Sequence, residues 1–585
     1  MAWRQVENER GVALISVLLV TLALVAIAAG ALMLTSQTSL VNRYHQRQSL
    51  LEAAADAGLE EARSRVNGTK TLYPDTGYNT LETNAPVYDA GGAVIPGLKR
   101  SLYVGPIGIS SGQYGVFGSA VTLVRDQSGN QVVRRLEVVQ ESFAKFAYFT
   151  NVEGAIVFGS GDQIFGPVHS NDEIEVSSSG GATFHGPVST AMTIVGKSYA
   201  TFKQGYSENA SPIAMPQTAA LTKLQTQAIA GNTAFISNNS GGAGEAEMRI
   251  EFVAIDLNGD GLTNGSNEGF IRVYQNADEA WVSGSRPTNT STTLFMRSED
   301  NCGHLHGTTF VNAAAHPLEP NADSWADALK SATRRCYLGG DSVLTNAFNP
   351  AGYLPWPGVV SPLVAGRPDA QYLFPISREL NPTFKGVIYV AGKVVISGRL
   401  RGRVTLAATN NIIIGDDVTY VTNPAAGTCV DILGLFSATS IVVADNLINA
   451  PTTVESYQTT GTFYTLDNDA HEFIHGVVLA LTNFTVDRYN QGANATSTGR
   501  ENCETTARGR GCLYLTGGII QEARGAVGTT SGFGNLKRYS YDACAFSNPP
   551  PYFPTTGRFA KGHYFEVDPT GFNIATYFAE LAAGT

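Results

Sequence analysis

The chain has 585 residues and a formal net charge of −11, from 39 lysines and arginines against 50 aspartates and glutamates. Charged residues make up only 15% of it, below the roughly 25% of an ordinary soluble domain. The acidic balance argues against a nucleic-acid-binding protein, because phosphate requires a basic surface. The 62 glycines favour turns and strands over helical bundles.

The N-terminal region predicts one long helix with two different halves. Residues 12–34 form an uncharged apolar run directly after Glu9-Arg10-Gly11, and about 20 apolar residues span a bilayer core. Apolar residues then recur at the spacing of one helix face as far as Val66, before Asn67-Gly68 ends the pattern. We expect a helix over residues 12–66, roughly 80 Å long. Its first half suits lipid, and its second half suits water or a protein neighbour.

This N-terminus resembles the class III leader and first helix of type IV pilins. The stretch Ala54-Ala55-Asp56-Ala57-Gly58-Leu59 is similar to the A-x-E/D-A-G-L stretch of PilX-type minor pilins. The resemblance implies that a prepilin peptidase cuts between Gly11 and Val12. It also implies other pilin-like subunits and an inner-membrane assembly platform as partners. Major pilins usually carry Glu at the fifth mature position, where this chain has Ser16, which argues against a role as bulk filament subunit.

Two other interpretations of the same segment remain open. It can be a plain transmembrane anchor without processing. It can also be a cleaved secretory signal, since Ala29-Gly30-Ala31 fits a small-x-small cleavage site.

The rest of the chain is predicted to be mainly β. A hairpin is expected from residues 119–124 and 132–139, with the turn at 126–130. Five short apolar strands follow one another between Val387 and Val421, with Gly, Asn and Asp at their corners. An earlier stretch, FGPVHS from Phe165, returns as HGPVST twenty residues later. We therefore expect a β-solenoid in preference to a sandwich.

The expected organisation has seven parts. In chain order these are a leader (1–11), the helix (12–67), a pilin-like hairpin region (68–145), a first β-solenoid part (146–212), an inserted subdomain (213–380), the main β-solenoid (381–545) and a C-terminal segment (546–585). The main β-solenoid also resembles a large uncharacterised domain found behind pilin-like N-termini in bacterial envelope proteins. The resemblance rests on the stretches ILGLFSATSIVV, GAVG and NPPPYFPT.

A calcium loop is predicted between two strands of the inserted subdomain. The sequence DLNGDGLTN matches the first half of a D-x-N-x-D-G loop, in which alternate residues point oxygen ligands inward. The twelfth loop position is Asn267 rather than an acid, and Glu268 follows it, which argues against an ordinary EF-hand. The candidate ligands of a structural Ca²⁺ are Asp256, Asn258, Asp260, Leu262, Asn264 and Glu268. The alternative is an acidic turn without metal.

A second motif, His471-Glu472-Phe473-Ile474-His475, matches the H-E-x-x-H of zinc proteases. Those enzymes need a helix, on which the two histidines share one face. Here a strand is expected to follow at once, and in a strand the histidines lie some 13 Å apart. Coincidence is therefore favoured over a zinc site.

The six cysteines form no C-x-x-C pair, and an even number behind a membrane-targeting segment suits disulfides. The disulfide candidates are Cys302, Cys336, Cys429, Cys503, Cys512 and Cys544. Cys503 and Cys512 are the easiest pair to bridge. A Cys302–Cys336 disulfide is favoured over a metal site with His304 and His306.

Asp416-Asp417 is interpreted as a solvated corner of the solenoid rather than a sugar-cleaving site.

These patterns favour a non-enzymatic, membrane-anchored envelope protein that reaches the cell surface. The expected function is that of a minor component of a type IV filament system, acting in assembly or adhesion. The alternatives are an anchored β-helix enzyme acting on polysaccharide and a secretion-system pseudopilin.

Overall fold

A computed structural model of the chain describes residues 9–583, apart from 75, 108–112, 114, 160–161, 179, 240–242, 245, 247, 276–303, 307–308, 312–352, 368, 445–471, 488, 491–511 and 530–532. The chain forms two compact units. The helix–sheet unit comprises Met1–Ser110, Phe117–Val139 and Phe559–Thr585, and the parallel-strand unit comprises Ser111–Val116 and Gln140–Arg558. The long N-terminal helix and the mainly β body agree with the predicted fold class.

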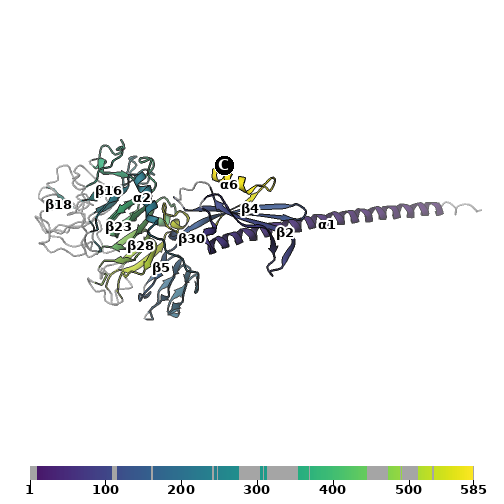
Figure 1. Cartoon of the computed structure of the whole chain (residues 1–585), viewed down its shortest axis with the longest axis horizontal. Coiled ribbons are helices and arrows are strands. Elements are labelled where there is room, and N and C mark those ends of the chain that lie inside the picture. The colour runs from purple at the N-terminus through teal and green to yellow at the C-terminus, as the bar shows by residue number, and fades with distance from the viewer. Residues whose placement is uncertain are drawn as a thin grey trace, which may run out of the picture. The chain divides into compact units, whose positions relative to one another are not determined.

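The helix–sheet unit consists of α1 (Glu9–Gly68) against a five-stranded sheet of order β1-β2-β3-β4-β30 (Figure 1). The strands are β1 (Asn79–Tyr88), β2 (Val94–Pro106), β3 (Phe117–Asp126), β4 (Gln131–Ser142) and β30 (Thr555–Val567). The pairs β1–β2, β2–β3 and β3–β4 are antiparallel. The short 3₁₀ helix η1 (Lys70–Leu72) follows α1, and α6 (Ile574–Ala583) lies near the C-terminus. The predicted helix and hairpin are both confirmed.

The hairpin turn forms for a reason that is visible in the sequence. The Asp126 side chain accepts backbone N–H bonds from Ser128 and Asn130, at 2.7 and 3.0 Å, and Gly129 adopts a positive φ of 87°. Asp and Gly are the residues that favour such a turn. The turn sets the register in which Val124 faces Val132 and alternate residues point to one face.

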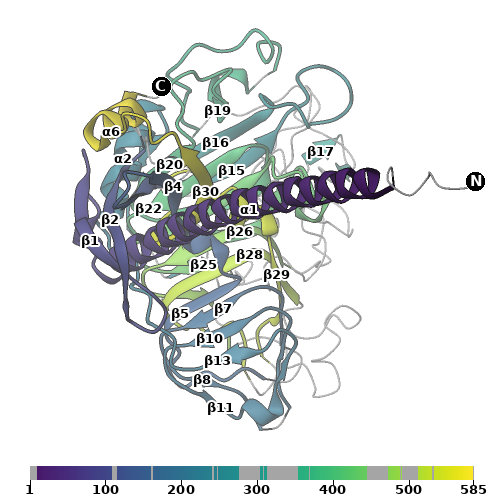
Figure 2. The same cartoon turned by 90° about the vertical axis from the view of Figure 1, so that its right-hand side faces the viewer.

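The parallel-strand unit is built from short strands that stack in parallel, each in register with the next. One row of the stack runs, in spatial order, β14 (Ala234–Ile236), β20 (Val387–Ala391), β22 (Arg403–Ala408), β24 (Ile432–Ser437), β26 (Glu472–Ala480), β28 (Cys512–Ala523), β5 (Tyr148–Val152), β7 (Val168–Ser170), β10 (Val188–Thr190) and β13 (Tyr206–Ser207). Much of this row can be followed in Figure 2. Such a stack is compatible with the predicted β-solenoid.

Further rows complete each turn of the stack. A second row contains β15 (Met248–Ala254), β21 (Val394–Leu400), β23 (Ile412–Tyr420), β25 (Ile441–Val443) and β27 (Phe484–Val486). A third contains β29 (Leu536–Tyr541), β6 (Gln163–Ile164), β9 (Thr183–Phe184) and β12 (Thr201–Phe202). The small pair β8 (Ile174–Glu175) and β11 (Ile194–Val195) is also parallel. The two copies of the repeated FGPVHS stretch thus contribute neighbouring strands of the stack, since Val168 pairs with Val188 and Ser170 with Thr190.

The remaining elements border or cover the stack. They are η2 (Phe143–Lys145), η3 (Lys197–Tyr199), α2 (Ala220–Ala230), β16 (Gly269–Gln275), β17 (His304–His306), β18 (Thr309–Val311), η4 (Ala370–Tyr372), β19 (Phe374–Pro375), η5 (Pro424–Ala426) and α5 (Ala543–Ser547). From the region expected to be an inserted subdomain, β14, β15, β16 and β19 join the large sheet.

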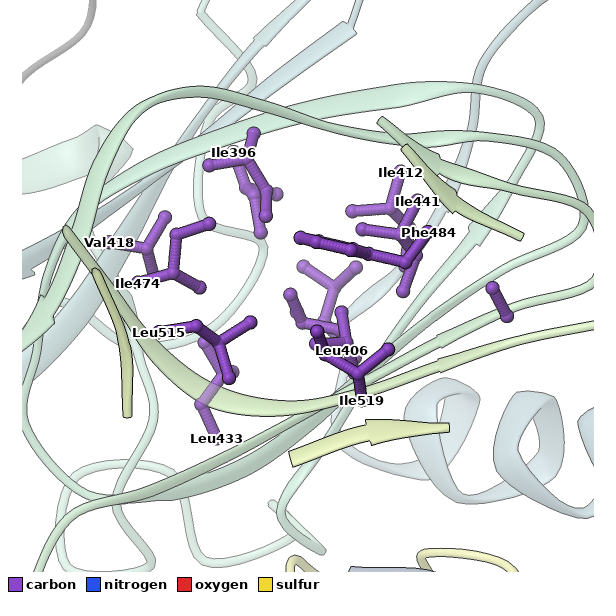
Figure 3. Close-up of a cluster of buried hydrophobic side chains, with 14 of the residues drawn as sticks. Ile396, Leu406, Ile412, Val418, Leu433, Ile441, Ile474, Phe484, Leu515 and Ile519 are labelled. Atoms are coloured by element: carbon purple, nitrogen blue, oxygen red, sulfur yellow. The ribbon is translucent and has the colours of Figure 1, made fainter. Parts of the chain in front are cut away.

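The core lies inside the stack. Leu406, Leu435 and Val478 form part of a ladder of paired apolar side chains, and Ile519 continues it (Figure 3). The outer face of the same strands is also buried, because α2, the η2 segment and Tyr552–Phe553 cover it. Strands that are buried on both faces are apolar throughout, which explains the uninterrupted apolar runs of the sequence.

Candidate functional site

The first half of α1 exposes its apolar side chains on every side. Between Val12 and Leu34 the large hydrophobic residues are 57–72% exposed, whereas such residues in the body are mostly buried. No charged residue occurs from Gly11 to Asn42. The helix is long and apolar enough to cross a membrane by length and composition. In water this surface would be costly, at about 25 cal/mol per Å² of apolar area.

Three threonine hydroxyl groups of this half are satisfied within the helix. Thr21 Oγ1 donates to the carbonyl oxygen of Val17 at 2.9 Å, and Thr35 Oγ1 donates to that of Ala31 at 2.8 Å. Thr38 bonds Leu34 in the same way. A hydroxyl that bonds the preceding turn presents no unsatisfied polar group to an apolar environment. The threonines therefore leave the exterior of this half apolar.

The second half of α1 packs on the sheet. Leu59, Ala62 and Val66 lie in one apolar cluster with strands β2 to β4, and Leu51, Ala54 and Ala55 lie in another. α6 packs on the sheet's opposite face through Phe578, which contacts Val121 and Leu123. The sheet therefore holds α1 from Leu51 onward and leaves the first half exposed.

The A-x-D-A-G-L stretch has a packing role in this unit. Ala54, Ala55, Gly58 and Leu59 are buried against the sheet, whereas Asp56 faces outward. A Cβ atom at Gly58 would lie 2.9 Å from side-chain carbons of residues on β2 and β3. Small residues here allow the helix and the sheet to approach closely, so the motif is explained by helix–sheet contact.

We expect Gly58→Leu to destabilise the helix–sheet unit by about 2 kcal/mol, the usual cost of adding side-chain volume to a packed contact. Differential scanning calorimetry of the detergent-solubilised full chain measures this as a lower Tm. Ala57→Leu is the matched control, because Ala57 is the exposed neighbour on the same turn. Equal Tm values for the two variants would contradict the role assigned to Gly58.

The loop predicted to bind calcium connects β15 and β16, which pair as an antiparallel hairpin. The Asp256 carboxylate accepts N–H bonds from Gly259 and Gly261, at 2.7 and 2.8 Å, and the Asp260 Oδ1 atom accepts one from Leu262 at 2.8 Å. The side chain of Asn258 accepts one from Asp260. Since each oxygen has about two lone pairs, these exposed side chains retain acceptor capacity.

Glu268 has a different position from the other predicted ligands. It is buried, and its carboxylate accepts N–H bonds from Leu257 at 3.1 Å and Gly265 at 2.5 Å, so it closes the loop on its inner side. The carbonyl oxygen of Asn264 accepts a bond from the guanidinium group of Arg401. Among the described residues no three His, Cys, Asp or Glu side chains are grouped to hold a metal. Any Ca²⁺ would therefore depend on Asp256, Asn258, Asp260 and the Leu262 carbonyl.

Arg401 joins this loop to the stack. Its Nε atom donates to Gly265 at 2.8 Å, and its Nη1 atom lies 3.0 Å from Asp431. Asp431 in turn accepts N–H bonds from Gly402 and Thr422. Both charged side chains are buried. Arg401 was not predicted from the sequence, because Gly398 and Gly402 bracket two arginines, Arg399 and Arg401, and the spacing does not show which of them is buried.

The H-E-x-x-H segment is part of β26, as expected for a strand rather than a helix. His471 lies outside the described residues. His475 accepts an N–H bond from Tyr420 through Nδ1 at 3.0 Å, and burial lowers its pKa to about 4. The imidazole is therefore neutral at physiological pH and binds the neighbouring strand.

The Asp416-Asp417 pair and the histidines His304 and His306 all lie on strands. Asp417 lies within β23 and accepts an N–H bond from Phe473 at 2.7 Å, so it joins neighbouring strands. Residues 412–415 and 418–421, expected as separate strands, belong largely to this one strand, whose register shifts beside Gly398. His304 and His306 lie on β17, whereas Cys302 is outside the described residues.

A disulfide joins Cys429 and Cys544, which are 115 residues apart. Cys512 is disulfide-bonded as well. Cys302, Cys336 and Cys503 lie outside the described residues, so the two favoured pairings remain predictions. The Cys429–Cys544 bond connects the segment before β24 to α5, and sequence spacing gave no reason to select this pair.

Comparisons with known proteins return little. No protein-family model matches the chain, and no curated protein is significantly similar to it. Among solved structures, the competence-associated pilin ComZ from Thermus thermophilus is similar over 88% of this chain and 96% of its own length, at 12% identity and a TM-score of 0.25. A TM-score this low supports no conclusion on the function of this chain.

Proposed function

We propose that this protein is a pilin-like, membrane-anchored envelope protein, and a minor component of a type IV filament system. The observation that carries the proposal is the division of α1 into an exposed apolar half and a half packed on an antiparallel sheet. A single helix of this kind can remain in a bilayer while the attached sheet remains in water. The proposed location is the inner membrane first and the cell surface afterwards.

The same surface suits transfer from lipid into a filament. The large exposed side chains of residues 12–34 are apolar, and no residue of this segment is charged, so they can pack against equivalent helices of other subunits when lipid is removed. The proposed partners are therefore other pilin-like subunits, delivered by an inner-membrane assembly platform. The mechanism is assembly rather than catalysis, and the parallel-strand unit is the part that would be presented for adhesion.

The decisive experiment is mass spectrometry of the N-terminal peptide of the protein isolated from its native envelope. A chain that starts at Val12 is the expected result, because prepilin peptidase would cut after Gly11. A chain that starts at Met1 would leave a plain anchor, and one that starts near Leu32 would indicate a secreted protein. Either of these results would refute the filament proposal.

We also propose that the β15–β16 loop binds one structural Ca²⁺. Support comes from the exposed oxygens of Asp256, Asn258 and Asp260, which alternate along the loop, and from the positive φ of Gly261, 81°. Hard oxygen donors of this kind suit Ca²⁺. The inward position of Glu268 and the nearby positive charge of Arg401 oppose tight binding.

Calcium should raise the Tm of the full chain relative to the same protein in chelator, since a ligand at 100 times its Kd stabilises the folded state by about 2.7 kcal/mol. Asp260→Asn keeps an oxygen acceptor for Leu262 and removes the charge, so it should abolish this increase. The control is Asp89→Asn, because Asp89 caps a similar exposed turn by accepting N–H bonds from Gly91 and Ala93. A Tm independent of calcium in the wild-type chain would refute the site.

A further inference from the structure

The pairing of β28 with β5 joins strands of the parallel stack that are some 370 residues apart in sequence. The chain enters the stack at β5, continues through β7 and β10 to β13, and later returns at β14 to build the rest up to β28. β28 then pairs with β5 (Figure 2), and β29 pairs with β6. Backbone hydrogen bonds and side chains join the two parts here, so a side-chain covalent bond at this junction would link them directly.

Lys537 and Asp162 face each other across the junction. Arg538 pairs with Gln163 and Tyr539 with Ile164, so Lys537 and Asp162 are the next residues in the same register. The Lys537 Nζ atom lies 3.2 Å from Asp162 Oδ2, although the two residues are 375 positions apart. This ion pair holds the Nζ atom beside the carboxyl group whose Cγ atom is bonded to Oδ2, so the reacting groups are already in contact.

Both side chains point toward the interior of the stack. Tyr539 and Ile164 belong to the central apolar cluster, and residues two positions away on a strand share its face. The side chains of Lys537 and Asp162 are only 17% and 9% exposed. Burying a lysine and a carboxylate together costs free energy, because the loss of hydration offsets much of the attraction between the two charges.

A second pair of charged residues lies at the same junction. Arg524 Nη1 is 3.2 Å from Glu153 Oε2, and Tyr148 donates to the same oxygen at 3.1 Å. The guanidinium group also lies 3.8 Å from the centre of the Phe158 ring. A lysine, an aspartate and a buried glutamate thus gather among aromatic rings at the place where the two parts of the stack meet.

We propose that Lys537 and Asp162 condense into an intramolecular isopeptide bond that closes this junction. Lys537 first passes one proton to the Asp162 carboxylate, which leaves a neutral amine and a carboxylic acid. The Nζ atom then attacks Cγ of Asp162, and the bond between Cγ and its hydroxyl oxygen breaks. Two of the three ammonium hydrogens leave with that oxygen as one water molecule, and the amide nitrogen keeps the third. No oxidant or other reactant is required.

The surroundings favour the neutral amine of Lys537. Burial lowers the pKa of the Lys537 amine, and the charge of Arg524 lowers it further, against the opposing effect of Asp162. Burial raises the pKa of Glu153 in spite of Arg524, which suits a group that exchanges protons. Glu153 acts on Lys537 electrostatically and raises the pKa of its amine against the effect of burial, so we assign Glu153 as a positioning residue that holds the ion pair together before the reaction.

Mass spectrometry of the intact full chain, after reduction of its disulfides, tests the proposal. The expected mass is one water molecule below the mass calculated from the mature sequence, and a proteolytic digest should contain the peptides of Lys537 and Asp162 as one branched species. Lys537→Arg retains the positive charge but should restore the full mass. Glu153→Gln should leave a measurable fraction of chains without the bond.

The matched control is Lys197→Arg, because Lys197 forms an exposed ion pair with Glu208 at 3.0 Å. This variant should keep the mass deficit of one water. A wild-type chain with the full calculated mass would overturn the proposal, and so would a water loss that maps to residues other than Lys537 and Asp162. Neither result would bear on the N-terminus at Val12, so this test is independent of the proposed filament function.

Discussion

Replacing Arg401 by methionine should lower the free energy of unfolding of the parallel-strand unit by about 3–5 kcal/mol, because it leaves Asp431 as a buried charge without its cation. The carbonyl oxygens of Asn264 and Gly265 would lose their donor at the same time. The β15–β16 loop should therefore become more mobile. Denaturant unfolding of the full chain measures the first effect, and hydrogen exchange of residues 256–268 measures the second.

Arg399→Met is the matched control for this substitution. Arg399 lies two residues earlier, near the end of β21, but its side chain is exposed. Exposed charges contribute little to stability, so this variant should unfold like the wild-type protein. If both variants unfolded at the same denaturant concentration, the buried Arg401–Asp431 pair would have no special importance.

Leu24→Arg should remove the protein from membranes and from filaments sheared off cells. Leu24 is 59% exposed within the uncharged half of α1, and a charge near the centre of a membrane helix costs about 3 kcal/mol. That cost corresponds to roughly a hundredfold change in partition. Quantitative immunoblots of membrane, soluble and sheared fractions would measure the redistribution.

Ala53→Arg tests whether any added charge on α1 has this effect. Ala53 is exposed on the second half of the helix, which suits water. This variant should fractionate like the wild-type protein. Unchanged membrane association of Leu24→Arg, in contrast, would show that residues 12–34 do not hold the protein in the bilayer.

Local features of the fold were predictable because they depend on short stretches. The uncharged run after Gly11 and the helical spacing up to Val66 predicted α1. The Asp126 turn predicted the β3–β4 hairpin, and the apolar runs after Val387 predicted β20 to β23. Each depends on hydrophobic periodicity and turn chemistry, which a single sequence displays directly.

Long-range pairings were not predictable. β5 pairs with β28 although some 370 residues separate them, and every strand of the row carries a similar apolar pattern, so the sequence does not specify which strands are neighbours. The Cys429–Cys544 bond and the Arg401 contacts depend on the same arrangement. For the candidate sites, residue types were visible in advance, whereas the inward position of Glu268 became visible only in three dimensions.

Both units contain segments that are far apart in the sequence, and this affects the order in which they can fold. β5, the first of the stacked strands, precedes its neighbour β28 by some 370 residues, and the sheet against α1 lacks its edge strand β30 until the chain is almost complete. Contacts that close such long loops form slowly, and strand edges without neighbours promote aggregation in the meantime. During synthesis, the early segments therefore expose strand edges without neighbours until the C-terminal strands arrive.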